Sequence, residues 1–420
     1  MKNKRALAFA ATLLLGASSL VACGGESHDY NLTLWCASNV KELMTKQANR
    51  WAESIKESYD VGIKVSAVSE QQAAGNMITS ASDGADVYCF AQDQISRLKA
   101  AHALTAIVGG ENISEITNNN DPESVNACKV GNELVAYPMT NDNGFFMYYD
   151  KSLFQDESKL ENWDDIIEVC KESGRKIYFE MSGWQSASFF YGFGCHSEWT
   201  TDSNGKFKSY DDTYHYENGP GGLKACQAIY DVMHSGVWVN NSEASTAFSK
   251  NASGVINAAV LVSGTWSYKA SLLGLGTENL GATDLPSATV NGDTEHLVSY
   301  KGAKLIGVKE HTDGTMSALS AALARYLTNE DCQRERFEEV GWGPSNKNLQ
   351  KSDAVKNHVA LKALAKQNEH STPQGQYPLK WWDAADGLAE YLEKASDGSE
   401  ASFKQALDEY LSAIDKLIEK

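Results

Sequence analysis

The chain has 420 residues, of which 42% are hydrophobic and 22% are charged. Its formal net charge is −18 at pH 7, and such an acidic surface repels phosphate backbones and argues against nucleic acid as a partner. A chain of this length exceeds one ordinary hydrophobic core, so we expect it to fold into two lobes.

The first 22 residues are predicted to be a signal peptide rather than part of the fold. Basic residues at positions 2, 4 and 5 precede an apolar run at 6–15, which is too short to span a bilayer stably. The run ends in Leu-Val-Ala-Cys, which resembles the cleavage box of bacterial lipoproteins. This resemblance implies that Cys23 becomes the lipid-bearing N-terminus and that residues 23–30 form a tether. The alternative is an ordinary cleavage site with an incidental cysteine.

The remaining cysteines are predicted to be small buried hydrophobic residues. They are odd in number, widely spaced and without a C-x-x-C pair, which argues against a disulfide framework or a zinc site. Most lie among apolar neighbours. They are Cys36, Cys89, Cys128, Cys170, Cys195, Cys226 and Cys332.

The first half of the chain alternates predicted strands and helices. A buried strand is expected at 32–36. A helix should follow it, with Asn39 as its N-cap and Glu42 reaching back. Further strands are expected at 63–67 and 85–90. Strands interleaved with helices predict a largely parallel sheet covered on both faces.

The second half also alternates predicted strands and helices, and it contains no proline-rich linker or internal repeat. The C-terminal segment, from Phe403 to Ile418, has the apolar spacing of an amphipathic helix. Other strands are expected at 177–180, 258–262 and 304–308, and other helices at 223–233 and 318–327.

Catalytic and metal-binding signatures are mostly absent. The chain has no G-x-S-x-G elbow, no H-E-x-x-H and no Walker loop, and its nine histidines are scattered. We therefore expect no cofactor, no metal and no enzymatic activity. The alternative is a surface glycosidase or lyase that uses Asp93, Asp142 or Asp386 as acid and base.

The tryptophans are the most informative residues. The chain has ten Trp and 18 Tyr, and several Trp follow turn-forming residues instead of lying in apolar runs. These are Trp184 after Ser-Gly, Trp266 after Gly-Thr, and the pair Trp381–Trp382 after Pro-Leu-Lys. An indole face suits the apolar face of a sugar ring, with carboxylates and amides binding the hydroxyls. The alternative for each single Trp is packing in the core.

Seven short segments in chain order resemble the extracellular solute-binding proteins of the maltose/maltodextrin-binding type, which serve ABC importers. Gly264-Thr265-Trp266, for example, matches a Gly-Pro-Trp of that family. The similarity runs from about Leu32 to Leu417. The other segments are 32–35, 82–87, 90–93, 135–139, 146–153 and 162–165.

The resemblance implies an α/β, two-lobed Venus-flytrap fold with two hinge crossovers and a ligand in the cleft between the lobes. The first lobe should comprise residues 31–140 and 300–343, and the second residues 141–299 and 344–420. Aromatic contacts to sugar rings would come from Trp184, Trp266, Trp382 and Phe90, with Trp381 adjacent. The acids that bind hydroxyls would be Asp93 and Asp142.

The predicted function is therefore that of a lipid-anchored, monomeric binding protein on the extracellular face of the cell membrane. It would capture an oligosaccharide, foremost an α-glucan of the malto-oligosaccharide type, and deliver it to an ABC permease. Gln94, Asp383 and Asp386 depart from the family pattern, which leaves other sugars open. The alternatives are another glycan or a polyol as ligand, a glycan-active surface enzyme, or a sensory lipoprotein.

Overall fold

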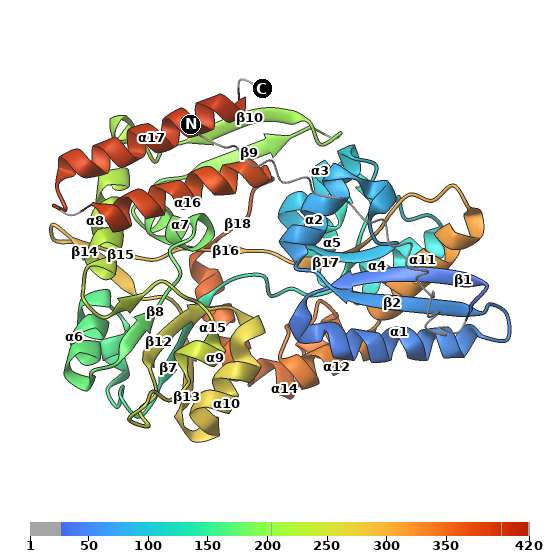
Figure 1. The fold of residues 1–420 in the computed structure, drawn as a ribbon, viewed down its shortest axis with the longest axis horizontal. Coiled ribbons are helices and arrows are strands. Elements are labelled where there is room, and N and C mark those ends of the chain that lie inside the picture. Colours follow the sequence, from blue (N-terminus) through green and yellow to red (C-terminus); the bar gives the residue numbers. More distant parts are fainter. Residues whose placement is uncertain (1–26, 203, 396, 419–420) are drawn as a thin grey trace, which may run out of the picture.

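The structure, a computed structural model, describes residues 27–418 except 203 and 396. The predicted signal peptide and Cys23 lie outside the described residues. Two lobes lie side by side, one mainly blue and orange and the other mainly green, yellow and red (Figure 1). Each lobe is built on its own five-stranded sheet.

The first lobe contains the sheet that begins at the described N-terminal end. Leu32, Leu34 and Cys36 alternate into its core, which explains why this segment forms a strand. In sheet order the strands are β2 (Val61–Ala67), β1 (Tyr30–Cys36), β3 (Val87–Ala91), β17 (Lys304–Val308) and β6 (Tyr137–Pro138). The helices around this sheet are α1 (Lys41–Ile55), α2 (Glu70–Thr79), α3 (Ile95–Ala100), α4 (Gly110–Asn119), α5 (Pro122–Ala127), α11 (Gly314–Leu327) and α12 (Glu330–Val340).

The second lobe has a sheet whose central strand is buried along its whole length, in keeping with its Ala-Ala-Val-Leu-Val-Ser sequence. In order, the strands are β11 (Trp238–Val239), β8 (Lys176–Tyr178), β12 (Ala258–Ser263), β7 (Phe146–Asp150) and β13 (Leu280–Thr283). Its helices are α6 (Trp163–Ser173), α7 (Gly183–Gly192), α8 (Gly221–Met233), α9 (Ala244–Ala247), α10 (Tyr268–Asn279), α15 (Val359–Gln367), α16 (Leu379–Lys394) and α17 (Glu400–Ile418).

Short elements complete the described chain. Four two-stranded sheets are formed by β4 (Lys129–Val130) with β5 (Glu133–Leu134), β9 (Ser197–Thr201) with β10 (Phe207–Asp212), β14 (Ser287–Val290) with β15 (Asp293–His296), and β16 (Ser299–Lys301) with β18 (Ser371–Pro373). Two short helices, α13 (Lys347–Gln350) and α14 (Asp353–Lys356), lie on the path from the first lobe to the second. The helix expected at the C-terminus is α17, which packs on α16.

The expectation of largely parallel sheets is wrong. In each five-stranded sheet, two neighbouring pairs are parallel and two are antiparallel. The antiparallel pairs all involve β17 in the first lobe and β7 in the second. Both strands enter their sheet directly from the other lobe, not through a helix packed on the same sheet, so the crossover rule that makes strands parallel does not apply to them.

The chain passes between the two lobes three times, whereas the resemblance implied two crossovers. It crosses between β6 and β7, between β16 and β17, and between Trp342 in the first core and Ala360 in the second. The third passage lets α15, α16 and α17 return to the second lobe. The C-terminal part of the chain therefore helps to build the cleft.

The N-cap predicted for the first helix is also wrong. Asn39 lies inside the 3-10 turn Ser38–Val40, and α1 begins at Lys41 with Val40 at its N-cap and no side-chain cap bond. The extra turn places Asn39 just after the carboxyl end of β1, where it is exposed. The exposed side chain of Asn39 is one of those that line the cleft between the lobes.

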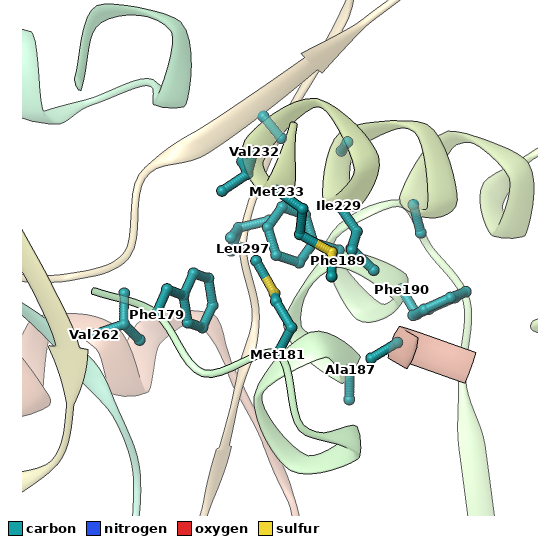
Figure 2. Close-up of a cluster of buried hydrophobic side chains, with 14 of the residues drawn as sticks. Phe179, Met181, Ala187, Phe189, Phe190, Ile229, Val232, Met233, Val262 and Leu297 are labelled. Atoms are coloured by element: carbon teal, nitrogen blue, oxygen red, sulfur yellow. The ribbon is translucent and has the colours of Figure 1, made fainter. Parts of the chain in front are cut away.

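The seven cysteines in the described residues are free and buried, which confirms that part of the sequence analysis. Figure 2 shows how the core of the second lobe is packed. Phe179 and Met181, which follow β8, lie beside Phe189 of α7 and Leu297. This apolar packing anchors the segment that leads from β8 into α7 and so fixes the base from which Trp184 projects.

Candidate functional site

A cleft of about 740 Å³ lies between the lobes and is lined by both. The first lobe contributes the loop after β1 at 37–39, the start of α2 at 69–71 and the segment after β3. The second contributes the segment after β8, the residues 242–245 that lead into α9, and the turn after β12. The cleft thus lies at the carboxyl ends of β1, β3 and β8, where open α/β sheets bind ligands.

Three tryptophans named in the sequence analysis line this cleft. Trp184 lies on the first turn of α7, Trp266 in the 3-10 turn Thr265–Ser267 after β12, and Trp382 on α16. The centroids of the Trp184 and Trp266 rings are 6.0 Å apart, with 45° between the ring planes. Segments that are far apart in the sequence therefore bring indole rings to one wall.

Trp184 is held in place by its neighbours. Its Nε1 donates a hydrogen bond to Oε1 of Gln374 at 3.1 Å, and Gln374 also lines the cleft. Its ring contacts Phe145 at a centroid distance of 4.6 Å and stacks on Tyr300 at 6.5 Å. A half-buried indole fixed in this way is an oriented flat surface that loses little conformational entropy when a ligand binds.

The structure places Trp381 behind the cleft wall, not in it. Trp381 is fully buried, stacks on Tyr377 at 4.0 Å and donates from Nε1 to the Tyr210 hydroxyl at 3.1 Å. Adjacent residues on a helix point about 100° apart, so Trp382 can face the cleft only if Trp381 turns away from it. Trp381 supports Trp382 edge-on at 4.8 Å.

Asp93 lines the cleft from the first lobe. Its carboxylate accepts a hydrogen bond from Nε2 of Gln94. Burial raises the pKa of Asp93 to about 7, although the Gln94 bond and the nearby charge of Arg97 oppose the shift. Arg97 itself donates to the Tyr377 carbonyl at 2.6 Å. Asp93 therefore changes between hydrogen-bond donor and pure acceptor near neutral pH.

Two other predicted residues lie outside the lining of this cleft. Phe90 is fully buried in the core of the first lobe, where its strand pairs with β17. Asp142 is 1% exposed on the first passage between the lobes. Its Oδ2 accepts bonds from Thr265 Oγ1 and the Gly343 amide, both at 2.6 Å. Asp142 thus ties two interlobe passages to the turn that carries Trp266.

Residues that the sequence analysis missed also line the cleft. Nζ of Lys304, on β17, lies 3.9 Å from the centroid of the Trp342 ring and 5.0 Å from that of Trp266. It also lies 3.9 Å from Oε1 of Glu70. Trp342 follows Gly341, so the turn-based criterion that found the other tryptophans applied to it as well. The sequence contains no such signal for Lys304, because this residue lies at the start of an apolar segment that predicts a buried strand.

The wall of the second lobe carries acids beside its indoles. Glu180 accepts a bond from the Ser242 hydroxyl at 2.6 Å, and Asp386 accepts one from the Gly183 amide at 2.5 Å. Burial raises the pKa of Asp386, helped by the negative charges of Asp383 and Glu180. Among the described residues that line the cleft, Lys304 is the only cation.

Within residues 27–418, apart from 203 and 396, no three His, Cys, Asp or Glu side chains are grouped as a metal site would need. No helix in these ranges has both the length and the apolar character of a membrane span.

A sequence profile described as "Bacterial extracellular solute-binding protein" matches residues 50–363. The chain belongs to this family. A galactooligosaccharide-binding protein of Bacillus subtilis strain 168 is 24% identical over 412 residues, which cover 93% of this chain and 92% of the relative.

Solved structures of similar fold span both lobes. The Thermus thermophilus maltotriose-binding protein, bound with maltotriose, has a TM-score of 0.73 at 16% identity and covers 92% of this chain and 100% of its own. The maltodextrin-binding protein of L. casei BL23 has a TM-score of 0.70 at 18% identity, with coverage of 91% and 98%. These likenesses confirm the two-lobed α/β fold expected from the sequence.

Proposed function

We propose that the protein is the binding component of an ABC sugar importer and captures an oligosaccharide in the cleft between its lobes. The observation that carries the proposal is the convergence of Trp184, Trp266 and Trp382 on one cleft wall, opposite polar groups of the first lobe. Indole faces cover the apolar faces of sugar rings, while carboxylates and amides accept bonds from the hydroxyls. The cleft volume of about 740 Å³ falls within the range of small-molecule sites.

The leading candidate ligand is an α-glucan of the malto-oligosaccharide type. The fold shared with maltodextrin- and maltotriose-binding proteins supports this choice. A galacto-oligosaccharide is the second candidate, because the curated relative from Bacillus subtilis bears that name. Both are rich in hydroxyls, in keeping with the many hydrogen-bond acceptors that line the cleft.

We also propose where the protein is located and which partner it serves. Lipidation of Cys23 would anchor the protein at the extracellular face of the cell membrane, with residues 23–30 as a tether. The protein would act as a monomer without cofactors, and the closed, liganded form would be recognised by an ABC permease. Membership of an extracellular solute-binding family supports this location.

A thermal-shift panel of gluco-, galacto-, xylo- and fructo-oligosaccharides tests the proposal, because a ligand that binds the folded state raises the melting temperature by mass action. We expect the gluco- or galacto-series to raise it, with the unchanged sugar recovered by chromatography. Absence of a shift with every sugar would contradict the binding role. Shortened products would favour the glycosidase alternative.

A further inference from the structure

The charge of the cleft is strongly one-sided. Five carboxylates line it, and Lys304 is the only cation among the described lining residues. The first lobe contributes two of the acids and the second contributes three. They are Glu70, Asp93, Glu180, Glu243 and Asp386. Neutral sugars need acceptors for their hydroxyls, but they do not compensate an excess of negative charge.

Lys304 does not neutralise the wall of the second lobe. Its ammonium lies over the Trp342 ring and close to Glu70, both of which belong to the first lobe. On the other wall, Glu180 and Asp386 each have one hydrogen bond, from a hydroxyl and an amide, and neither has a cation within 4.0 Å among the described residues. Both acids are exposed, so water hydrates them, but no described cation shares their charge beside the stacking indoles.

The first wall also has a buried acceptor that lacks a hydrogen-bond donor among the described residues. Gln94 lines the cleft and is 2% exposed, and its Nε2 is used by Asp93 and Tyr377. Its Oε1 has no hydrogen-bond partner among the described residues, whereas Oε1 of Glu70 has the Lys304 ammonium at 3.9 Å. A buried acceptor without a donor is costly, so a ligand that brings N–H groups gains more here than one that brings acceptors.

Mutual repulsion among the carboxylates on and beside the second wall also favours a cationic ligand. The charges of Glu180, Asp383 and Glu390 all disfavour ionisation of Asp386. A cation placed on this wall would relieve that repulsion and form charge-assisted hydrogen bonds, which are about twice as strong as neutral ones. A protonated amine also has three N–H donors, whereas a hydroxyl has one.

We propose that the cleft prefers an oligosaccharide carrying a protonated amine, an amino sugar, over the corresponding neutral oligosaccharide. This inference rests on the proposed function, since it assumes that sugar rings stack on the indoles. The amine is placed on the second wall, at Glu180 and Asp386. The same charge pattern disfavours a sugar that carries a carboxylate.

The experiment compares matched ligands by calorimetry at pH 7 and low salt. The probes are maltotetraose and β-1,4-galactotetraose, each with its 6-amino-6-deoxy derivative at the non-reducing end and the corresponding uronic acid. We expect the amine to lower Kd about tenfold relative to its parent and the acid to bind more weakly than the parent. The preference should shrink at 0.5 M salt, because ionic attraction across the open cleft is screened.

Variants assign the preference to its residues. The double substitution Glu180→Gln with Asp386→Asn should bring the ratio between amine and parent Kd values close to one. Glu393→Gln, two turns farther along α16 and outside the cleft lining, should leave the ratio unchanged. Spermidine carries amines without sugar rings, so it should bind far more weakly than the amino sugars.

The outcomes separate the two proposals. Equal Kd values for amine and parent would overturn the charge preference and leave oligosaccharide binding intact. Spermidine binding as tight as that of the amino sugar would overturn it as well, since sugar stacking would then add nothing. No binding of any tetrasaccharide would overturn the proposed function itself, and the charge preference with it.

Discussion

The two walls of the cleft differ in both chemistry and support. The wall of the second lobe presents Trp184, Trp266 and Trp382, backed by buried rings such as Tyr300 and Trp381. The wall of the first lobe is formed mostly by short polar segments at 37–39 and 69–71, with Asp93 behind them. Most of the flat apolar area therefore lies on the second lobe, because Trp342, the indole that the first lobe contributes, is 1% exposed. Small hydrogen-bonding groups lie mainly on the first lobe.

We therefore expect the two walls to contribute differently to ligand affinity. A ligand that stacks on the indoles of the second lobe gains most of its contact area before the lobes close. The first lobe then adds hydrogen bonds, whose net value in water is about 1 kcal/mol each. Substitutions in the second wall should therefore cost far more affinity than substitutions in the first.

The largest effect is expected for Trp266→Ala. Loss of this indole removes stacking area and the partner of Trp184, so Kd for the best oligosaccharide of the panel should rise more than about 100-fold. Calorimetry measures Kd, and the unliganded protein should melt nearly as wild type does. Trp238→Ala, at the sheet edge outside the cleft, is the control and should leave Kd unchanged. Unchanged binding in Trp266→Ala would remove this residue from the site.

An intermediate effect is expected for Asp93→Asn on the first wall, and it should depend on pH. The pKa of Asp93 is raised to about 7, so its carboxylate accepts charge-assisted hydroxyl bonds at pH 8.5 but is protonated at pH 5. We expect Kd to rise about tenfold at pH 8.5 and to change little at pH 5. Titrations at both pH values measure this, and an equal ratio at both would contradict the role of the ionised group.

A smaller effect is expected for Lys304→Met, which keeps the apolar stem and removes the ammonium. The cation lies between an indole of each lobe, at 3.9 Å from Trp342 and 5.0 Å from Trp266. Cation–π contacts contribute roughly 0.5 to 2 kcal/mol, so affinity should fall about fivefold. Lys64→Met, exposed on the same sheet, serves as the control. Equal affinity in both variants would exclude a link between the walls through this cation.

The smallest effect concerns stability. The folded pKa of Asp93, about 7, lies above its ordinary value of 3.8, so between these pH values the folded state holds a proton that the unfolded state has released. Raising the pH through this window destabilises the fold. Asp93→Asn lacks this dependence, so its melting temperature relative to wild type should rise by about 2 to 4 °C between pH 4.5 and pH 8. A constant difference would contradict the raised pKa.

Sequence reasoning identified the cleft tryptophans because each follows a turn instead of lying in an apolar run. It could not separate Trp382 from Trp381, since only the path of α16 decides which of two adjacent indoles faces the cleft. Phe90 and Asp142 lie close to the cleft along the chain but point into the core and across the interlobe passages. The two lobes were predictable from length and alternating elements, whereas the sheet directions depended on how the chain re-enters each lobe.

The buried thiols have a practical consequence. All seven cysteines in the described residues are buried, and burial raises the pKa of each, to about 12 for Cys36. Reactive dyes attack thiolates, so a protein produced from residue 27 onward should give almost no background labelling. A single cysteine introduced at exposed Ser245, on the rim of the cleft, would then carry one fluorophore. The fluorescence of this labelled protein would then report closure of the two lobes around the cleft.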